Sequence, residues 1–330
     1  MGATGDGQLV VDNSILAAVA KCPTYAYVRY ACGLATRGTS LALASGSSLH
    51  LGLAAWLEGS SIEDSVAVCA TDYERAVERY LRLIEAEELP ADDRRFAPEW
   101  IEAILHQYLT RYEGKWPFKV IKGSTEQPIS APFEDCNLPS GKDVLYVARL
   151  DGIVRRWESA DRWNLDWKST RKASEWWIAK QKTSSQFTGQ RWITEQTEGT
   201  EIAGVVLAVL EVPEPHRSEN RCKEHKVSYQ ECSIRHAGSD FVYITRGLAE
   251  IEAWKWTARG LIREYDRLLT RAEEDGMAAM PDIPMRGRFN EGCTFCEMKK
   301  FCDLGRNVSK ASVKATFVEQ RWNPLQRGED

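Results

Sequence analysis

The sequence lacks any apolar run that approaches the ~20 residues a membrane-spanning helix requires, so no membrane span and no membrane partner are expected. Its first residues, MGATGDGQ, lack the basic start and the apolar core of a signal peptide. Internal repeats and long low-complexity segments are also missing. These absences predict a cytoplasmic globular protein of 330 residues without a clear domain boundary.

The chain also lacks an excess of positive charge. The chain has 43 lysines and arginines against 48 aspartates and glutamates, for a net charge of −5. Proteins that coat nucleic acid without specificity usually carry the opposite sign, so this class is disfavoured. An enzyme whose basic residues line one groove is compatible with the balance, because acidic metal ligands lower the pI without repelling DNA once the metal is bound.

The chain has nine cysteines, and an odd number argues against a disulfide framework in a cytoplasmic chain. Cys293, Cys296 and Cys302 lie within ten residues, and thiolates at such spacing can converge on one soft metal centre. A fourth ligand is needed, for which Cys22 is the first candidate and Cys32 its rival. The remaining cysteines are interpreted as ordinary core or surface residues: Cys69, Cys136, Cys222 and Cys232.

The spacing of apolar residues predicts helices over 12–35, 46–57, 62–87, 97–113, 174–198 and 240–274. Strands are predicted near 118 and over 143–157, 163–168, 202–212 and 226–235. This order indicates an α/β domain with a mixed central sheet flanked by helices. We divide it into a helical N-terminal part (1–115), a core (116–275), a cysteine-cluster segment (276–305) and a flexible tail (306–330).

The segment DVLYVARLDGIVRRWESADRWNLDWKST, residues 143–170, is the most informative. Alternation brings Asp151, Asp166 and Lys168 to one face of a predicted hairpin. A two-residue turn at Ser159-Ala160 would place Asp151 across from Lys168 and Ile153 across from Asp166. Paired carboxylates suit a hard divalent cation that activates water, and a lysine can orient that water or stabilise charge on a phosphate. The alternative interpretation is a solvated strand face.

This hairpin resembles motifs II and III of the PD-(D/E)XK nuclease superfamily, with Asp151 as the first carboxylate and Asp166-Trp167-Lys168 as the second motif. His50, in GSSLHLGL, resembles the upstream histidine that gives RecB-like nucleases a nitrogen ligand to the metal. SSQFTGQRW resembles their Gln-x-x-x-Tyr motif, with Gln186 in place and Gln190 where tyrosine is expected. Glu126 weakly matches an acidic position of these relatives.

The resemblance implies a restriction-endonuclease-like core in a single nuclease domain over residues 1–330. It implies catalytic roles for Asp151, Asp166, Lys168 and Gln186. His50, Asp151 and Asp166 would then bind Mg²⁺ or Mn²⁺. The alternative for His50 is an ordinary structural or exposed histidine.

The Cys-Pro-Thr-Tyr segment at Cys22 and the C-terminal Cys-x2-Cys-x5-Cys resemble the iron–sulfur nucleases of this superfamily, AddB and the CRISPR-associated RecB-like exonucleases. The resemblance implies a [4Fe–4S] cluster held by Cys22, Cys293, Cys296 and Cys302, with zinc as the alternative. Such a centre would clamp the two ends of the chain together, since metal-binding free energy becomes folding free energy.

The function implied by the resemblance is a metal-dependent DNA nuclease, an exonuclease on single-stranded DNA or duplex ends. A helicase, or a recombination or CRISPR adaptation complex, is the implied partner. The alternative from another class is a non-catalytic or partner-dependent iron–sulfur module that binds or processes DNA. Candidate contacts with DNA follow the second acidic strand: Arg171, Lys172, Trp176, Trp177, Lys180 and Lys182.

Overall fold

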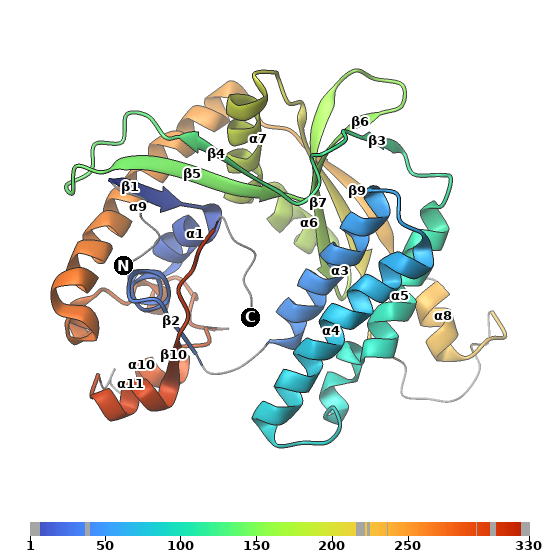
Figure 1. Ribbon diagram of the computed structural model, residues 1–330, viewed down its shortest axis with the longest axis horizontal. Coiled ribbons are helices and arrows are strands. Elements are labelled where there is room, and N and C mark those ends of the chain that lie inside the picture. Colours follow the sequence, from blue (N-terminus) through green and yellow to red (C-terminus); the bar gives the residue numbers. More distant parts are fainter. Residues whose placement is uncertain are drawn as a thin grey trace.

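The computed structural model describes residues 7–36, 40–215, 222, 225–235, 237–294, 296–303 and 308–324. Within these ranges, the main sheet has the order β3-β6-β7-β8-β9, and only its β7–β8 pair is parallel. Its strands are β3 (Phe118–Val120), β6 (Gly152–Arg156), β7 (Arg162–Thr170), β8 (Gly204–Glu211) and β9 (Ser239–Ile244). The mixed sheet that the sequence predicts is therefore confirmed (Figure 1).

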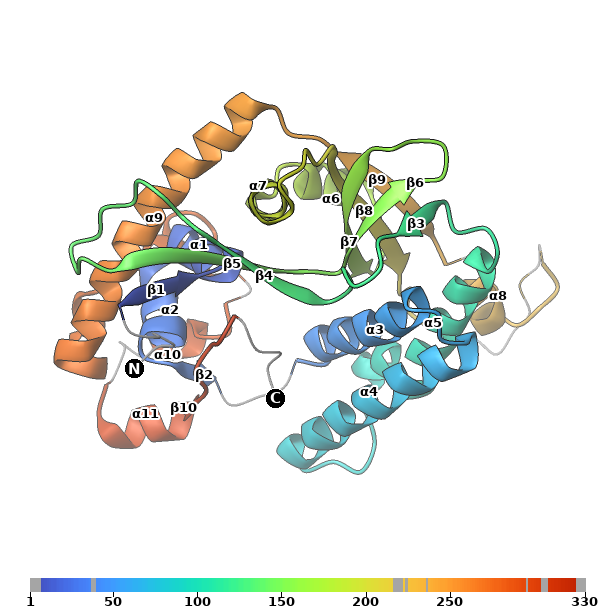
Figure 2. The same cartoon turned by 45° about the horizontal axis from the view of Figure 1, so that its top comes forward.

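Helices cover both faces of this sheet (Figure 2). The alternation along β8 explains why: Val206, Ala208 and Leu210 face one core, and Val205, Leu207 and Val209 face another. The first core is closed by α3 (Leu41–Leu57), α4 (Ile62–Ile84) and α5 (Pro98–Tyr112), with the 3₁₀ turn η2 (Ala91–Phe96) between the last two. The second is closed by α6 (Glu175–Lys182) and α7 (Ser185–Glu198).

A second sheet, of order β1-β5-β4, lies beside the first (Figures 1 and 2). It packs against helices from the N-terminal and C-terminal parts of the chain. Its strands are β1 (Gln8–Val11), β4 (Gln127–Pro132) and β5 (Asp143–Leu150). The helices in its core are α1 (Asn13–Lys21), α2 (Pro23–Ala26), the π-helical turn η1 (Tyr27–Ala31), part of α7 and the long helix α9 (Leu248–Asp275).

The C-terminal segments add to the core of the β1-β5-β4 sheet. They are the 3₁₀ turns η3 (Gly276–Asp282) and η4 (Arg286–Arg288), α10 (Lys299–Asp303), α11 (Lys310–Thr316) and β10 (Phe317–Glu319). β10 pairs antiparallel with β2 (Leu34–Thr36), and Phe317 is buried. Residues 308–324, part of the predicted tail, thus contain a short helix and a paired strand. None of the helices in the described part of the chain is long and apolar enough to cross a membrane.

The predicted hairpin over residues 143–170 differs from the structure in two ways. The first strand is not continuous, because β5 and β6 separate at Asp151 and pair in different sheets. The predicted register is wrong by two residues: Gly152 lies opposite Leu165, and Ile153 lies opposite Asn164. The connection is the longer segment 157–161 rather than a two-residue turn. Because side chains alternate with period two, an even shift leaves each residue on its predicted face.

Three further predictions are wrong. Residues 226–235 are not a strand, since 229–235 form helix α8 (Tyr229–Arg235), whose first turn is capped by Ser228 Oγ accepting from Glu231 N at 3.1 Å. The helix predicted over 240–274 begins only at Leu248, because Ser239–Ile244 form the edge strand β9. The single helix predicted over 174–198 is interrupted between α6 and α7.

Gly189 permits the close approach of α7 to β5 and α9. A Cβ there would overlap the Tyr146 hydroxyl and lie 2.9 Å from Trp254 Cζ2. We predict that Gly189→Ala lowers the free energy of unfolding by about 1–3 kcal/mol, the usual effect of overpacking a core. Denaturant titration followed by circular dichroism measures the change.

Gly260→Ala is the matched control, because this exposed glycine of α9 has open space around it. It should stabilise the protein by about 0.5–1 kcal/mol through helix propensity alone. Equal stability of Gly189→Ala and the wild type would contradict the close packing of α7.

Candidate active site

The site is centred on the point where β5 and β6 separate. Trp167 N donates to Asp151 Oδ2 at 2.6 Å, and the ladder between β6 and β7 ends at the pair Gly152–Leu165. The Asp151 carboxylate thus accepts from the backbone of β7 just beyond the last β6 pairing. This contact holds Asp151, only 8% exposed, beside the acidic segment of β7.

Strand β7 supplies the second carboxylate and the lysine. Asp166 is 2% exposed, and its Oδ2 lies 2.7 Å from Lys168 Nζ. The Lys168 ammonium also lies 6.0 Å from the centre of the Phe187 ring. The alternate residues of the strand, Leu165 and Trp167, point into the opposite core below α3 and α5, as their alternation predicts.

Helix α7 places two amides on Asp166. Gln186 Nε2 and Gln190 Nε2 donate to Asp166 Oδ1 at 2.9 and 3.0 Å. The two residues are four apart and therefore share one helical face. Ser184 caps this helix by accepting from Gln186 N. Gln190, which replaces the tyrosine of the resembling motif, thus makes the same contact as Gln186.

Helix α3 brings His50 to Asp151. His50 Nδ1 lies 3.1 Å from Asp151 Oδ1. The helix starts at Ser40, whose side chain accepts from Leu43 N, and it packs tightly on its neighbours at Gly52. A Cβ at Gly52 would lie 2.7 Å from both Leu105 Cδ2 and the Ser65 carbonyl oxygen. This packing fixes the height of His50 above the sheet.

Glu126 completes this group, although the predicted ligand set omits it. One ligand atom each of His50, Glu126 and Asp151 lie within 4.8 Å of one another. The residue precedes β4 and has a φ of +52°, in the left-handed region that non-glycine residues seldom adopt. Its backbone oxygen accepts from Arg149 Nη1 at 3.0 Å. In the sequence, only the weak motif match points to it.

The charges of the site act strongly on one another. Burial raises the pKa of Asp151, but His50 and Lys168 outweigh it and bring that pKa below its usual value. Burial keeps the pKa of Asp166 above its usual value, and the neighbouring Asp151 charge adds to this rise. Burial lowers the pKa of Lys168, yet the two carboxylates raise it overall. Imidazole and carboxylate donors in this arrangement fit Mg²⁺ or Mn²⁺.

The four predicted cysteine ligands line one small cavity between α1, α2 and the C-terminal segment: Cys22, Cys293, Cys296 and Cys302. Cys32 is not among the lining residues, and burial raises its pKa to about 11. A Cβ on Gly287 would lie 3.2 Å from Cys22 Cβ and 3.4 Å from Cys293 Sγ. Glycine at this position therefore leaves room around the sulfur atoms for a metal centre.

The walls of this cavity are held together by hydrogen bonds from side chains to backbone carbonyl groups of distant segments. The Thr24 hydroxyl lies within hydrogen-bond distance of the carbonyl oxygens of Ile283 and Pro284, at 3.0 and 2.9 Å, and donates its one hydrogen to this pair. Asn290 Nδ2 donates to the Lys21 carbonyl oxygen at 3.0 Å. The juxtaposition of Cys22 with the C-terminal cysteines thus has support from neighbouring residues.

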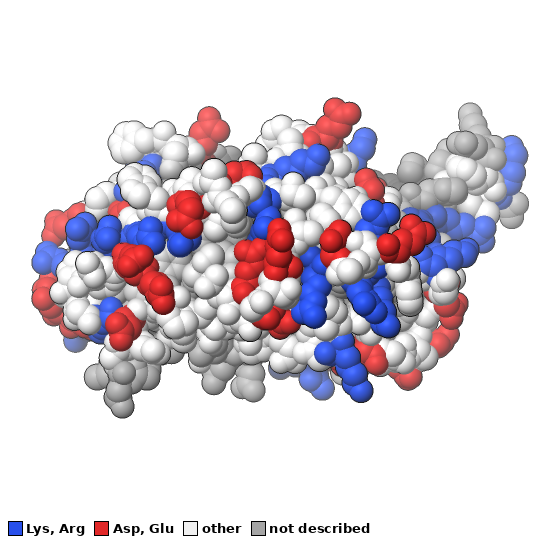
Figure 3. Space-filling view, turned by 90° about the horizontal axis from the view of Figure 1, so that it is seen from above, with Lys and Arg blue, Asp and Glu red and all other residues white. Residues whose placement is uncertain are grey.

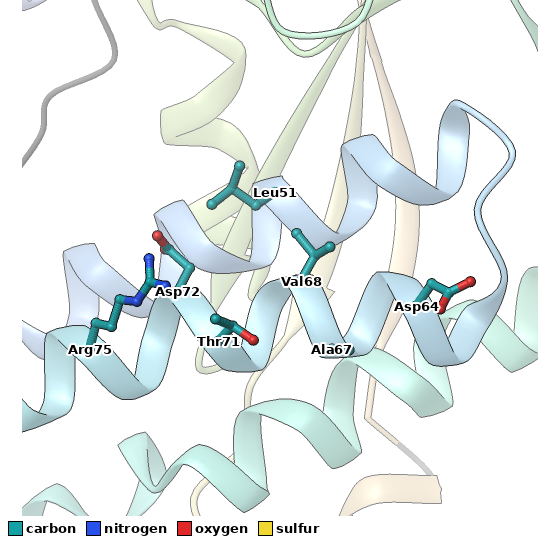
Figure 4. A pocket seen from close by; sticks show the side chains of 7 residues that line it. All are labelled: Leu51, Asp64, Ala67, Val68, Thr71, Asp72 and Arg75. Carbon is teal, nitrogen blue, oxygen red and sulfur yellow. The ribbon is translucent and has the colours of Figure 1, made fainter.

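Two surface features lie apart from these sites. A pocket of about 470 Å³ lies along α3 and α4, lined by residues such as Leu51, Val68 and Arg75 (Figure 4), and it contains none of the predicted site residues. The face seen from above shows acidic and basic side chains next to one another rather than one continuous basic field (Figure 3). This mixture agrees with the net negative charge of the chain.

Comparison with known proteins identifies the family of the chain. A search of curated proteins gives no match. The family model of the PD-(D/E)XK nuclease superfamily matches residues 13–303, which include both acidic strands, His50, the two glutamines and all four cysteines of the cavity. Membership in this superfamily indicates a metal-dependent nuclease that hydrolyses phosphodiester bonds in nucleic acid. From its fold, its acidic site and this match, the chain belongs to the PD-(D/E)XK nuclease superfamily.

Proposed function

We propose that this protein is a RecB-like, metal-dependent DNA exonuclease that acts on single-stranded DNA or on duplex ends. The observation that carries the proposal is the convergence of His50 and Asp151 at the point where β5 and β6 separate, next to Asp166 and Lys168 on β7. A site that only stabilises the fold has no need of so many buried charges, whose desolvation is costly.

In this proposal, His50, Asp151 and Asp166 bind the divalent cation, and Glu126 lies within reach as a further ligand. When bound, such a cation polarises the phosphate and lowers the pKa of a water molecule. Gln186 and Gln190 hold the Asp166 carboxylate in place through their amide groups. Lys168 supplies a positive charge where a water molecule or a phosphate oxygen needs a hydrogen-bond donor.

The burial of the acids supports a single strand as the substrate. Asp151 and Asp166 are 8% and 2% exposed, so a scissile phosphate has little surface over which to reach them. A separated strand can do so more easily than an intact duplex. The proposal places the enzyme in the cytoplasm, where thiols stay reduced, with a helicase or a recombination or CRISPR adaptation complex as its partner.

We propose further that Cys22, Cys293, Cys296 and Cys302 hold a [4Fe–4S] cluster. Four thiolates around one cavity suit such a cluster, and they would also suit zinc. Iron is preferred because the spacing resembles that of iron–sulfur nucleases. Its role is structural, since the cavity joins α1 and α2 to the segment beyond α9.

The nuclease proposal predicts that Mg²⁺ or Mn²⁺ supports degradation of labelled linear single-stranded DNA and that EDTA stops it. Circular single strands should resist, because an exonuclease needs an end. Asp151→Asn and Asp166→Ala should reduce activity to background. Lys168→Ala should lower the rate by about a hundredfold or more, because a charge that stabilises the transition state is lost.

Asp161→Ala is the matched control, because this exposed aspartate lies in the loop between β6 and β7. Asp151→Asn keeps an acceptor for Trp167 N, so its inactivity would not follow from unfolding. Mn²⁺ binding measured by calorimetry should weaken in Asp151→Asn and persist in Lys168→Ala. Near wild-type cleavage by either aspartate variant would refute the assignment, and cleavage of circles would refute the exonuclease.

The cluster proposal predicts a brown protein with about four irons per chain after anaerobic purification. Cys22→Ser should bleach the colour and lower the melting temperature by several degrees, since the link between the chain ends is lost. Cys136→Ser, which replaces a cysteine outside the cavity, should change neither. A colourless protein that binds zinc at these cysteines would keep the link and exclude the iron.

Trp176 is a predicted contact for bases. It is 72% exposed at the start of α6, with Lys180 Nζ 5.6 Å from its ring centre, whereas Trp177 packs against the core below α6. Loss of one stacking platform costs about 1–3 kcal/mol, so Trp176→Ala should raise KM for single-stranded DNA roughly 5- to 150-fold with little change in kcat. Trp256→Ala, which removes an equally exposed tryptophan of α9, should leave KM unchanged.

A further inference from the structure

The connection between β8 and β9 contains a group of sulfur and nitrogen donors that the candidate active site does not use. The group is Cys222, His225 and Cys232. The sequence interpretation of these two cysteines as ordinary residues misses their convergence. Helix α8, which carries Cys232, lies at the outer edge of the molecule beside α5, on the opposite side from α10 and α11 (Figures 1 and 2). The group is therefore separate from the Cys22 cavity.

The distances within this group match those around one small ion. His225 Nδ1 lies 3.3 Å from Cys232 Sγ and 3.6 Å from Cys222 Sγ, and one ligand atom from each residue lies within 4.8 Å of the others. Tetrahedral ligands at about 2.3 Å for sulfur and about 2.0–2.1 Å for nitrogen stand roughly 3.5–3.8 Å apart. The three side chains need little movement to share an ion.

Two local structures present these ligands. Cys222 N donates to Val227 O at 2.7 Å, and Lys226 N donates to Cys222 O at 2.9 Å. Lys226 has a φ of +59°, so the chain reverses tightly and Cys222 and His225 come to the same side. Cys232 lies in the first turn of α8, where its N–H donates to Ser228 O at 2.9 Å. The turn that carries Cys222 and His225 and the first turn of α8, which carries Cys232, thus bring the three side chains together.

We propose that Cys222, His225 and Cys232 bind a zinc ion, distinct from both the catalytic cation and the Cys22 cavity. Thiolate and imidazole donors select zinc over Mg²⁺, which prefers oxygen ligands. Zinc takes four ligands, and a water molecule would complete the set beside these three side chains.

The ion has a structural role. α8 is the one regular element described between β8 and β9, and connections of this length with so little regular structure are uncommon in compact domains. Arg111 of α5 donates to Ala237 O and Arg235 O at 2.8 and 3.1 Å, which docks the end of α8 on α5. Zinc would close the other side of the same connection and hold it against the helical layer.

The test measures zinc and iron in the full-length protein by elemental analysis. Cys232→Ser and His225→Ala should each lose about one zinc per chain with iron unchanged. Cys22→Ser should keep this zinc whatever metal its cavity holds. The matched controls are Cys136→Ser and His106→Ala, which replace a cysteine and an exposed histidine outside the group and should retain the full zinc content.

A second measurement uses Co²⁺ as the probe. When Co²⁺ is added to chelator-treated full-length protein, a thiolate-to-cobalt absorption band should appear. The band should be weaker in Cys232→Ser than in Cys136→Ser. Addition of zinc should abolish it. His225 is exposed, so its variant tests the site even where a cysteine variant fails to fold. Zinc content that is unchanged in His225→Ala, or a Cys222–Cys232 disulfide found by non-reducing mass spectrometry, would overturn the proposal. Nuclease activity of His225→Ala should stay near wild type, so the two proposals fail independently.

Discussion

The hydrogen bond from Trp167 N to Asp151 Oδ2 is the contact on which the site depends. The ladder between β6 and β7 ends at Leu165, because the chain before Asp151 pairs with β4 and β1 instead. A buried N–H without an acceptor costs about 1–3 kcal/mol, and the Asp151 carboxylate removes that cost. The same bond fixes this carboxylate beside Asp166. The separation of the two sheets and the pairing of the two acids therefore have one cause.

The charges around this bond are balanced in a way that favours function over stability. Asp166 is held by Lys168, Gln186 and Gln190, and Asp151 by His50 and a backbone N–H. Buried ion pairs contribute little net stability, because desolvation offsets most of the attraction. Glu126 adds the strain of a left-handed backbone at the same place. A divalent cation between the acids would relieve their repulsion and release the Lys168 ammonium toward a phosphate.

The sequence predicts the acidic face correctly because alternation depends only on parity, so a register error of two residues leaves Asp166 and Lys168 on the predicted side. It misses the break at Asp151, because no turn residue other than Gly152 marks it and the pairing with β1 joins residues far apart in the chain. The strand predicted over 226–235 is a helix from Tyr229, and the Ser228 side chain caps its first turn. The sequence gives only a weak motif match for Glu126, and the Cys222–His225–Cys232 group becomes recognisable only when the backbone turns are known.

The cysteine cavity and the active site are connected through a short series of elements. Cys22 ends α1, which starts directly after β1, and β1 pairs parallel with β5 from Gln8–Asp143 to Val11–Tyr146. Asp12, between β1 and α1, accepts from Ile15 N at 2.8 Å and from Trp322 Nε1 at 3.0 Å. The C-terminal segment therefore also contacts the junction between β1 and α1. β5 then ends one residue before Asp151. A metal centre that holds the chain ends together would therefore stabilise the strand that delivers the first carboxylate, although it takes no part in the chemistry.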